Sequence, residues 1–355
     1  MVRLIEFLIS LVVVVVLFVV IALFLPSKRM YTYSVETNRP LTTVYDLFNG
    51  FGRFKDWNPL VRYDKNMRTE ISGPASGKGA KFSYSSHDNI IGQGSWEIIE
   101  STPQRIKYRL TGPTRGEEKT MTIKLERTGQ FNRNVKITQE YRVNYGWDLI
   151  GRYAGLYVTR NIGDDVKRGL DKFSSFLATI PKFDYSQHPG EFGFVDMPMQ
   201  DALVVTTAAK RTNDEIAVQM TNQKSWIDKV MAANGLVADG PLRIVTNEFT
   251  SDTYAFDVVQ PVRKADAPEG QPAGEKMILQ MEGPVSYVQL PARRYATTTY
   301  TGPAPGLARV RDVLRAWAMT HGVDTDDRPF EEYLAGIGSM SDDTAQYKVY
   351  WPIKQ

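Results

Sequence analysis

The residues best suited to chemistry in this 355-residue sequence are few and scattered. The chain has no cysteine, which excludes disulfides, thiolate nucleophiles and cysteine metal ligands together. It has three histidines, His87, His188 and His321, which lie far apart and never occur in an HExxH-like spacing. We therefore expect neither a zinc enzyme nor a histidine-based triad, and we predict no cofactor and no metal.

Two clusters of polar residues have a simpler interpretation than catalysis. His87 and Asp88 are neighbours in "SSHDN", and neighbours on a strand point to opposite faces, so a turn is the better interpretation than an acid–base pair. The three carboxylates of "DTDDRP" lack the alternation and the terminal glutamate of a calcium loop. Both segments are predicted to be surface connections.

The closing segment "QYKVYWPIKQ", residues 346–355, has the pattern of a β-strand with two different faces. One face carries apolar side chains, namely Tyr347, Val349 and Trp351. We expect that face to pack in a core, and we expect Lys348 and Tyr350 on the other face to look towards a binding cleft. The alternative is an edge strand whose lysine extends into solvent.

Length and composition indicate an ordinary globular protein with two domains. A hydrophobic content of 42% and a charged content of 23% are typical of folded chains, and 355 residues exceed one usual domain. A net charge of +3 is too small to indicate a nucleic-acid partner, so none is expected.

The N-terminal segment is predicted to be a membrane anchor over residues 1–29. Phe7–Leu25 contains 19 residues without a charge, which as a helix would span roughly 28 Å. The following "ALFLPSKR" offers no convincing cleavage site, although a cleaved signal peptide is the alternative. The flanking positive charges are Arg3 on one side and Lys28, Arg29 and Arg39 on the other. They narrowly favour a single-pass inner-membrane protein with a cytoplasmic soluble part, and a periplasmic one stays open.

Residues 30–181 are predicted to form an antiparallel sheet covered by a helix. Alternating segments such as "AKFSYSS", "GSWEIIE" and "QRIKYRL" are separated by turns. The apolar stripe of the helix at 162–180 consists of Val166, Leu170, Phe173, Leu177 and Ile180. A long helix across a curved sheet is a helix-grip arrangement. The aromatic residues expected on the inner face, either as cavity lining or as packing, are Phe82, Tyr84, Trp96 and Tyr108.

This part of the chain resembles a known superfamily in four stretches, "FKDWNPLVRYD", "GPASGKGAKFSY", "GQGSWEIIESTPQRIKYRL" and "GLDKFSSFLA". They are similar to the START-related (SRPBCC) superfamily of polyketide cyclase-like and lipid-transfer proteins. The resemblance implies a hydrophobic ligand cavity between helix and sheet. Because the superfamily shares no catalytic residues, it implies a container more than a reaction.

Residues 182–194 are rich in Pro, Gly and polar residues and are predicted to be a linker. The rest, 195–355, contains a strand–helix–strand pattern twice. "MPMQDALVVTTAAKRT" parallels "VQLPARRYATTTYTGP", and each precedes an amphipathic helix. We therefore predict a pseudo-twofold α+β domain with a cleft between its halves.

This second half resembles the gyrase-inhibitor-like (GyrI-like) small-molecule-binding domain, the effector-binding module of bacterial transcription regulators. The resemblance rests on "LPARRYATTTYTGP", the helix after it, "RPFEEYL" and "YKVYWPIK". It implies binding of an amphiphilic, often cationic, compound. The family commonly has a glutamate, used by some members in hydrolysis, at the position that matches Lys348. Its absence argues against both a cationic ligand and a hydrolase.

Other residues could complete the cleft of the second domain. Glu248 in "RIVTNEF" and Glu282 in "LQMEGP" lie near predicted strands and could supply a carboxylate, although such glutamates usually face water. Tyr300 and Tyr350 would offer apolar area with a polar tip, and the alternative for both is the core.

The sequence thus predicts an α+β protein with an anchor and two non-catalytic domains that bind or sense an amphiphilic small molecule or lipid. One alternative is an enzyme, cyclase-like in the first cavity or hydrolytic in the second cleft. Another is a structural or scaffold protein whose cavities are filled by side chains.

Overall fold

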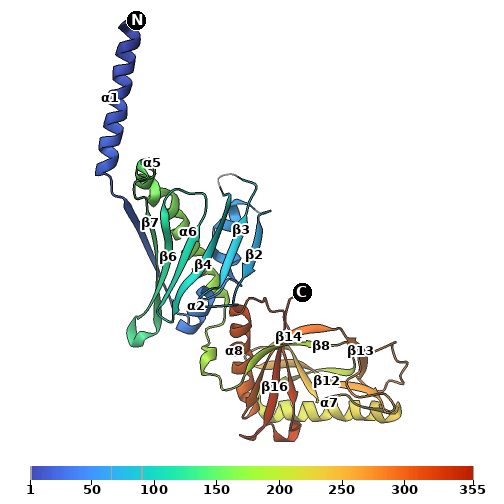
Figure 1. Ribbon diagram of the computed structural model, residues 1–355. Coiled ribbons are helices and arrows are strands. Elements are labelled where there is room, and N and C mark those ends of the chain that lie inside the picture. The colour runs from blue at the N-terminus through green and yellow to red at the C-terminus, as the bar shows by residue number, and fades with distance from the viewer. Residues whose placement is uncertain (1, 65, 89–90, 355) are drawn as a thin grey trace. The chain divides into compact units, whose positions relative to one another are not determined.

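The computed structural model describes residues 2–64, 66–88 and 91–354 (Figure 1). The chain divides into two compact units, Met1–Lys182 and Phe183–Gln355. The segment expected to be a linker therefore lies almost entirely in the second unit. Its last residues begin strand β8 (Phe192–Met197), which pairs with β14 (Arg293–Thr301).

The chain begins with helix α1 (Val2–Phe24), whose side chains are mostly exposed. The stretch Arg3–Phe24 is long and apolar enough to cross a membrane, and a signal sequence would have the same property. Ala22, near the end of the helix, is fully buried against the rest of its unit.

The first unit is built on one antiparallel sheet of seven strands in the order β1-β7-β6-β5-β4-β3-β2. The strands are β1 (Lys28–Thr37), β2 (Arg68–Ser72), β3 (Lys81–Ser85), β4 (Gln93–Thr102), β5 (Arg105–Thr111), β6 (Glu117–Thr128) and β7 (Asn134–Asn144). Helix α6 (Val158–Thr179) packs beside the curled sheet (Figure 1). The predicted α+β class and helix-grip arrangement are confirmed.

Helix α6 buries the stripe that the sequence predicts, but it begins at Val158, four residues before the predicted start. The ring of Phe173 stacks on Phe48 of α2 (Leu41–Phe48) with centroids 4.1 Å apart. It also meets Trp57 of α3 (Phe54–Trp57) edge-on at 5.5 Å. These aromatic contacts close one end of the space between helix and sheet. The remaining short helices of the unit are α4 (Leu60–Tyr63) and α5 (Leu149–Ala154).

The second unit contains a sheet in the order β13-β9-β12-β11-β15-β16-β14-β8, with the short β10 paired to β12. The strands not yet given are β9 (Gln200–Lys210), β10 (Leu236–Ala238), β11 (Arg243–Phe249), β12 (Thr253–Lys264), β13 (Ser286–Leu290), β15 (Phe330–Tyr333) and β16 (Gln346–Pro352). Its helices are α7 (Asn213–Ala233) and α8 (Leu307–Thr320).

The strand order has the predicted internal symmetry. The first half runs β8, β9, α7, β11 and β12, and the second runs β13, β14, α8, β15 and β16. The equivalent strands are β8 and β13, β9 and β14, β11 and β15, and β12 and β16. When each strand in the sheet order is replaced by its equivalent, the result is the same order read from the other edge. The halves meet where β11 pairs with β15, and the leading strand of each half pairs with the other half. This exchange of edge strands ties the repeats into one domain.

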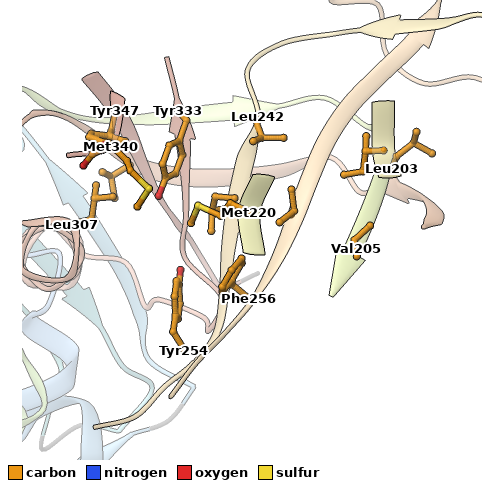
Figure 2. Close-up of a cluster of buried hydrophobic side chains, with 14 of the residues drawn as sticks. Leu203, Val205, Met220, Leu242, Tyr254, Phe256, Leu307, Tyr333, Met340 and Tyr347 are labelled. Atoms are coloured by element: carbon orange, nitrogen blue, oxygen red, sulfur yellow. The ribbon is translucent and has the colours of Figure 1, made fainter. Parts of the chain in front are cut away.

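Both helices of the second unit share one hydrophobic core with the sheet. Figure 2 shows Met220 of α7 and Leu307 near Met340 and the rings of Tyr254, Tyr333 and Tyr347. The apolar face of the closing strand lies in this core, as the alternation predicts, through Tyr347, Val349 and Trp351. The side chain of Thr212 caps α7 by accepting a hydrogen bond from the backbone NH of Glu215 at 3.4 Å.

Candidate ligand-binding cavities

The first unit contains a cavity of about 770 Å³ between the first half of α6 and the sheet. Its apolar lining comprises Trp57, Leu60, Tyr84, Trp96, Leu110, Pro113, Met121, Tyr141, Ile162 and Val166. A volume of several hundred Å³ with apolar walls and few polar groups is typical of small-molecule sites.

Of the four aromatic residues expected on the inner face, Tyr84 and Trp96 line this cavity. Phe82 and Tyr108 are packed in the core beside it. The ring of Phe82 lies 4.7 Å from that of Phe54, and the hydroxyl of Tyr108 donates to the backbone carbonyl of Phe48. Both side chains point to the inner face of the sheet, as expected, but the segment before and within α3 packs over them. The alternation of residues along a strand does not reveal such a contact with a distant segment.

A glycine makes room for Tyr84 across the neighbouring strand. A Cβ atom on Gly94 of β4 would lie 2.3 Å from the Tyr84 hydroxyl oxygen, so only glycine allows the ring to lie there. Partial burial raises the pKa of Tyr84 above its ordinary value, and the phenol stays neutral.

Two buried polar atoms in the cavity wall lack hydrogen-bond partners within the described part of the chain. They are Oε1 of Gln139 on β7 and Nε1 of Trp57 on α3, and both residues are at least nine-tenths buried. The amide nitrogen of Gln139 donates a hydrogen bond to the sulfur of Met121 at 3.2 Å. Leaving a buried polar group unpaired costs about 1 to 3 kcal/mol, so the residues that line the cavity include one unsatisfied acceptor and one unsatisfied donor.

Lys119 lines the same cavity, but its ammonium group already donates three hydrogen bonds within the protein. A register shift between Glu117 and Thr120 of β6 re-aims the strand, and Nζ donates to Gly112 O at 3.1 Å and to Thr114 Oγ1 at 3.0 Å. A third bond reaches Thr114 O. Burial lowers the pKa of Lys119. Its role in the cavity is to hold the 112–114 loop.

Charged side chains gather where α6 borders the cavity. The hydroxyl of Tyr63 donates to Asp165 at 2.5 Å, and Arg168 lies 4.0 Å from both Asp164 and Asp165. Arg160, one turn earlier, is exposed. These residues give the cavity a polar border around apolar walls.

The second unit contains a smaller cavity of about 180 Å³ between the start of α7, the start of α8 and the sheet. Its apolar walls come from Ile216, Met220, Phe249, Tyr254, Leu307, Tyr333 and Met340. Two arginines, Arg211 and Arg311, also line it, and no carboxylate does among the described residues. Both guanidinium groups lie near the ring of Phe249, at 4.2 Å and 5.6 Å.

A buried ion pair lies behind this cavity. Glu331 of β15 is fully buried, and its carboxylate lies 2.5 Å from Nε of Arg311 on α8. Burial raises the pKa of Glu331 above its ordinary value, and the nearby guanidinium opposes that shift. Arg311 lines the cavity whereas Glu331 does not, so a ligand meets the cation first. Neither residue was expected from the sequence to belong to a site.

On the other face of the closing strand, the side chains of Lys348 and Tyr350 lie beside a buried carboxylate and a neighbouring arginine. The hydroxyl of Tyr350 donates to Glu332 at 2.8 Å, and Arg243 bonds the second oxygen of that carboxylate at 3.0 Å. Lys348 is half-buried, with Nζ 5.5 Å from the Tyr350 ring centroid. These side chains form a satisfied polar cluster with structural contacts.

The remaining expected cleft residues lie outside the cavity lining. Glu248 follows a bulge in β11 and is exposed, and Glu282 is exposed in the loop before β13. Tyr300 comes nearest: its hydroxyl donates to Pro303 O at 3.1 Å, next to the lining residue Ala304, and its ring stacks on Tyr347.

The second unit is an α+β domain with internal twofold symmetry and a small cavity between its helices. Residues 219–354 match the family described as the GyrI-like small molecule binding domain. The predicted resemblance of the second half is confirmed over that segment. No curated protein matches the sequence significantly.

Several solved structures align to part of the chain. The C-terminal domain of EcmrR is 16% identical with a TM-score of 0.38, covering 47% of this chain and 99% of that one. EcmrR bound to DNA aligns over 60% of this chain and 86% of its own, at 13% identity and a TM-score of 0.38. Norcoclaurine synthase from Thalictrum flavum, in complex with dopamine and hydroxybenzaldehyde, is 13% identical with a TM-score of 0.34, covering 42% and 87%.

Proposed function

We propose that this protein binds an amphiphilic small molecule or lipid in the cavity of its first unit while α1 anchors it in a membrane. The observation that carries the proposal is the 770 Å³ cavity, whose apolar walls contain the unpartnered Gln139 Oε1 and Trp57 Nε1. An apolar body would fill the space beside Trp96 and Met121. A polar head with a donor and an acceptor, such as a hydroxyl, would satisfy both orphaned atoms.

Anchoring fits such a ligand because amphiphiles concentrate in bilayers. Helix α1 would be the single span, in an inner membrane, with the soluble part on the cytoplasmic side by a narrow charge asymmetry. A cleaved signal sequence is the competing interpretation of α1. It would leave the cavity intact but would separate it from the membrane.

For the second unit we propose a small ligand that is neutral or anionic. Two guanidinium groups line the cavity, and the buried carboxylate of Glu331, which pairs with Arg311, does not line it. A lone organic cation would therefore face repulsion at the surface it must contact. The volume of about 180 Å³ suits a compact molecule or one end of a longer one.

The competing proposal of an enzyme would need an acid or base that reaches a cavity. In the first cavity the bordering carboxylates of Asp164 and Asp165 are engaged by Tyr63 and Arg168. In the second unit the buried Glu331 has a raised pKa but does not line the cavity. The scaffold alternative requires filled cavities, and a space of 770 Å³ in the first unit counts against it.

A fluorescence titration of the full chain in lipid nanodiscs tests the proposal. N-phenyl-1-naphthylamine should gain emission on binding and lose it when 1-dodecanol is added. Ile162→Trp, which fills part of the cavity, should abolish the gain beyond that of empty nanodiscs. Equal emission from the wild type and Ile162→Trp would contradict ligand binding in this cavity.

A further inference from the structure

The segment from Trp147 to Tyr157 exposes an unusual amount of apolar surface. Trp147 is 82% exposed, Tyr157 59%, Ile150 55% and Leu156 51%. All four belong to or flank the short helix α5 and the turn after it. We call these four side chains the 147–157 surface. Large exposed aromatic and aliphatic groups that lie close together mark an interaction site.

Helix α5 is fastened to the end of α1. The hydroxyl of Tyr153 donates to the backbone carbonyl of Phe18 at 3.0 Å, and the two rings stack with centroids 4.5 Å apart. Nη1 of Arg152 donates to the carbonyls of Ala22 and Leu23, both at 3.2 Å. A cationic donor at the last turn satisfies carbonyls that have no helical partner and complements the helix dipole.

These bonds fix the depth of α5 relative to the membrane span. Phe18 lies six residues before the helix end at Phe24, which is about 9 Å along the axis. The 22-residue span is about 33 Å long, close to the roughly 30 Å of a hydrocarbon core. Tyr153, bonded to Phe18, therefore reaches into the hydrocarbon of one leaflet, and Arg152, bonded to the carbonyls of Ala22 and Leu23, lies at the level where the span leaves the hydrocarbon.

We propose that the 147–157 surface inserts into the boundary between headgroups and acyl chains of a phospholipid bilayer, next to α1. This inference rests on the proposed anchoring by α1. Trp and Tyr favour that boundary because their rings are apolar and their polar tips bond to headgroups or water. Ile150 and Leu156 add aliphatic area. The depth, the residue types and the exposure of the 147–157 surface all favour a phospholipid bilayer as its partner.

The insertion would also bring the large cavity to the bilayer. Helix α6 begins directly after Tyr157, and Arg160 and Ile162 in its first turns line the cavity. An amphiphile leaving the acyl region would meet the exposed guanidinium of Arg160 before the apolar walls. The 147–157 surface thus gives the first cavity direct access to ligands dissolved in the membrane.

The absence of cysteine from the sequence allows single spin labels to be placed in the full chain. Ile150→Cys and Leu156→Cys test the surface, and Val14→Cys, in mid-span, tests the anchor. Phe131→Cys is the matched control because Phe131 is also exposed, at 76%, but lies beyond the other end of β7. The eleven residues of β7 separate the two ends by about 36 Å.

Accessibility to oxygen and to a water-soluble nickel complex is then measured in phosphatidylcholine and phosphatidylglycerol vesicles. We expect an oxygen-to-nickel ratio several-fold higher at Ile150 and Leu156 than at Phe131, and highest at Val14. A high ratio at Val14 with water-like ratios at Ile150 and Leu156 would overturn this inference and leave the anchor intact. A water-like ratio at Val14 would overturn the anchor and the inference together.

Discussion

The carboxylate of Glu331 lies 2.5 Å from the guanidinium of Arg311, between strand β15 and helix α8. Neither group has another described polar partner for the atoms that meet there, and both residues are buried. A buried ion pair of this kind balances two desolvation costs against one attraction. The ion pair affects which ligand charge the cavity favours, because Arg311 lines the cavity and Glu331 does not.

Removing the cation alone should destabilise the second unit strongly. Arg311→Met leaves the Glu331 carboxylate buried without a partner, and we expect the free energy of unfolding to fall by about 3 to 5 kcal/mol. The double variant Arg311→Met with Glu331→Leu should recover most of that loss because no charge stays buried. Chemical denaturation measures all three proteins.

The matched control for this experiment is Arg309→Met, which changes an exposed arginine on the same helix. It should alter stability by less than about 0.5 kcal/mol. A loss for Arg309→Met equal to that for Arg311→Met, or no recovery in the double variant, would show that the ion pair is not the cause.

The orphaned acceptor in the first cavity predicts two opposite effects of one substitution. Gln139→Leu removes an unpaired oxygen, so the ligand-free protein should gain about 1 kcal/mol of stability. Its affinity for 1-dodecanol should fall about tenfold, since a hydrogen bond contributes roughly 1.4 kcal/mol. Dodecyl methyl ether, which cannot donate, should lose little affinity.

Thermal unfolding and probe displacement measure the two quantities for Gln139→Leu. Gln104→Leu, on an exposed turn, is the control and should change neither. A Gln139→Leu protein that is less stable and binds the alcohol normally would assign the glutamine a purely structural role.

The two faces of the second sheet should respond differently to loss of a hydroxyl. Tyr350→Phe removes the hydrogen bond to Glu332 and should cost about 1.5 to 3 kcal/mol of stability without changing ligand affinity. Tyr254→Phe changes the cavity lining and should alter affinity for small carboxylates such as benzoate. Isothermal titration with benzoate compares them, and altered binding by Tyr350→Phe alone would place the site on the opposite face.

His188 predicts part of the acid sensitivity of the second unit. Its Nε2 lies 3.1 Å from Thr298 Oγ1 and 3.0 Å from Thr299 O, and burial lowers its pKa from the ordinary 6.5, opposed by the bond to Thr299. Because the folded pKa is the lower one, the contribution is present above pH 6.5 and is lost as pH falls through the folded value.

The variant His188→Gln should therefore lose less stability than the wild type between pH 7 and pH 5. Urea unfolding between pH 7 and pH 5 measures the loss of stability. Equal losses in the wild type and in His188→Gln would contradict a role for His188 in the acid sensitivity.

Local patterns predicted the covering helix of the first unit and the alternation in most of its strands. The stripe on α6 and the alternation in β3 to β6 follow directly from side-chain periods of 3.6 and 2. Which inner residues border empty space does not follow, because Phe82 and Tyr108 are covered by a distant segment. Gln139 could have been found, since it is the polar member of the inward set that includes Ile137 and Tyr141.

The site of the second unit was harder to predict. Glu331 and Glu332 are adjacent, so one must face the helices and the other the opposite side of the sheet. The pairing of Glu331 with Arg311 depends on the crossing of β15 and α8, which no local pattern encodes. The pattern of the closing strand indicated Lys348 and Tyr350 instead, which do not line the 180 Å³ cavity.

Binding of an amphiphile in the first cavity is tested most directly by identifying which molecules co-purify with the full chain from its native membrane. The wild type and Ile162→Trp are purified in parallel and extracted, and the extracts are compared by mass spectrometry. A defined amphiphile with a hydroxyl-bearing head, near one molecule per chain in the wild type and depleted in Ile162→Trp, is the predicted result. Identical extracts from the two proteins that match the bulk membrane composition would contradict ligand binding in the first cavity.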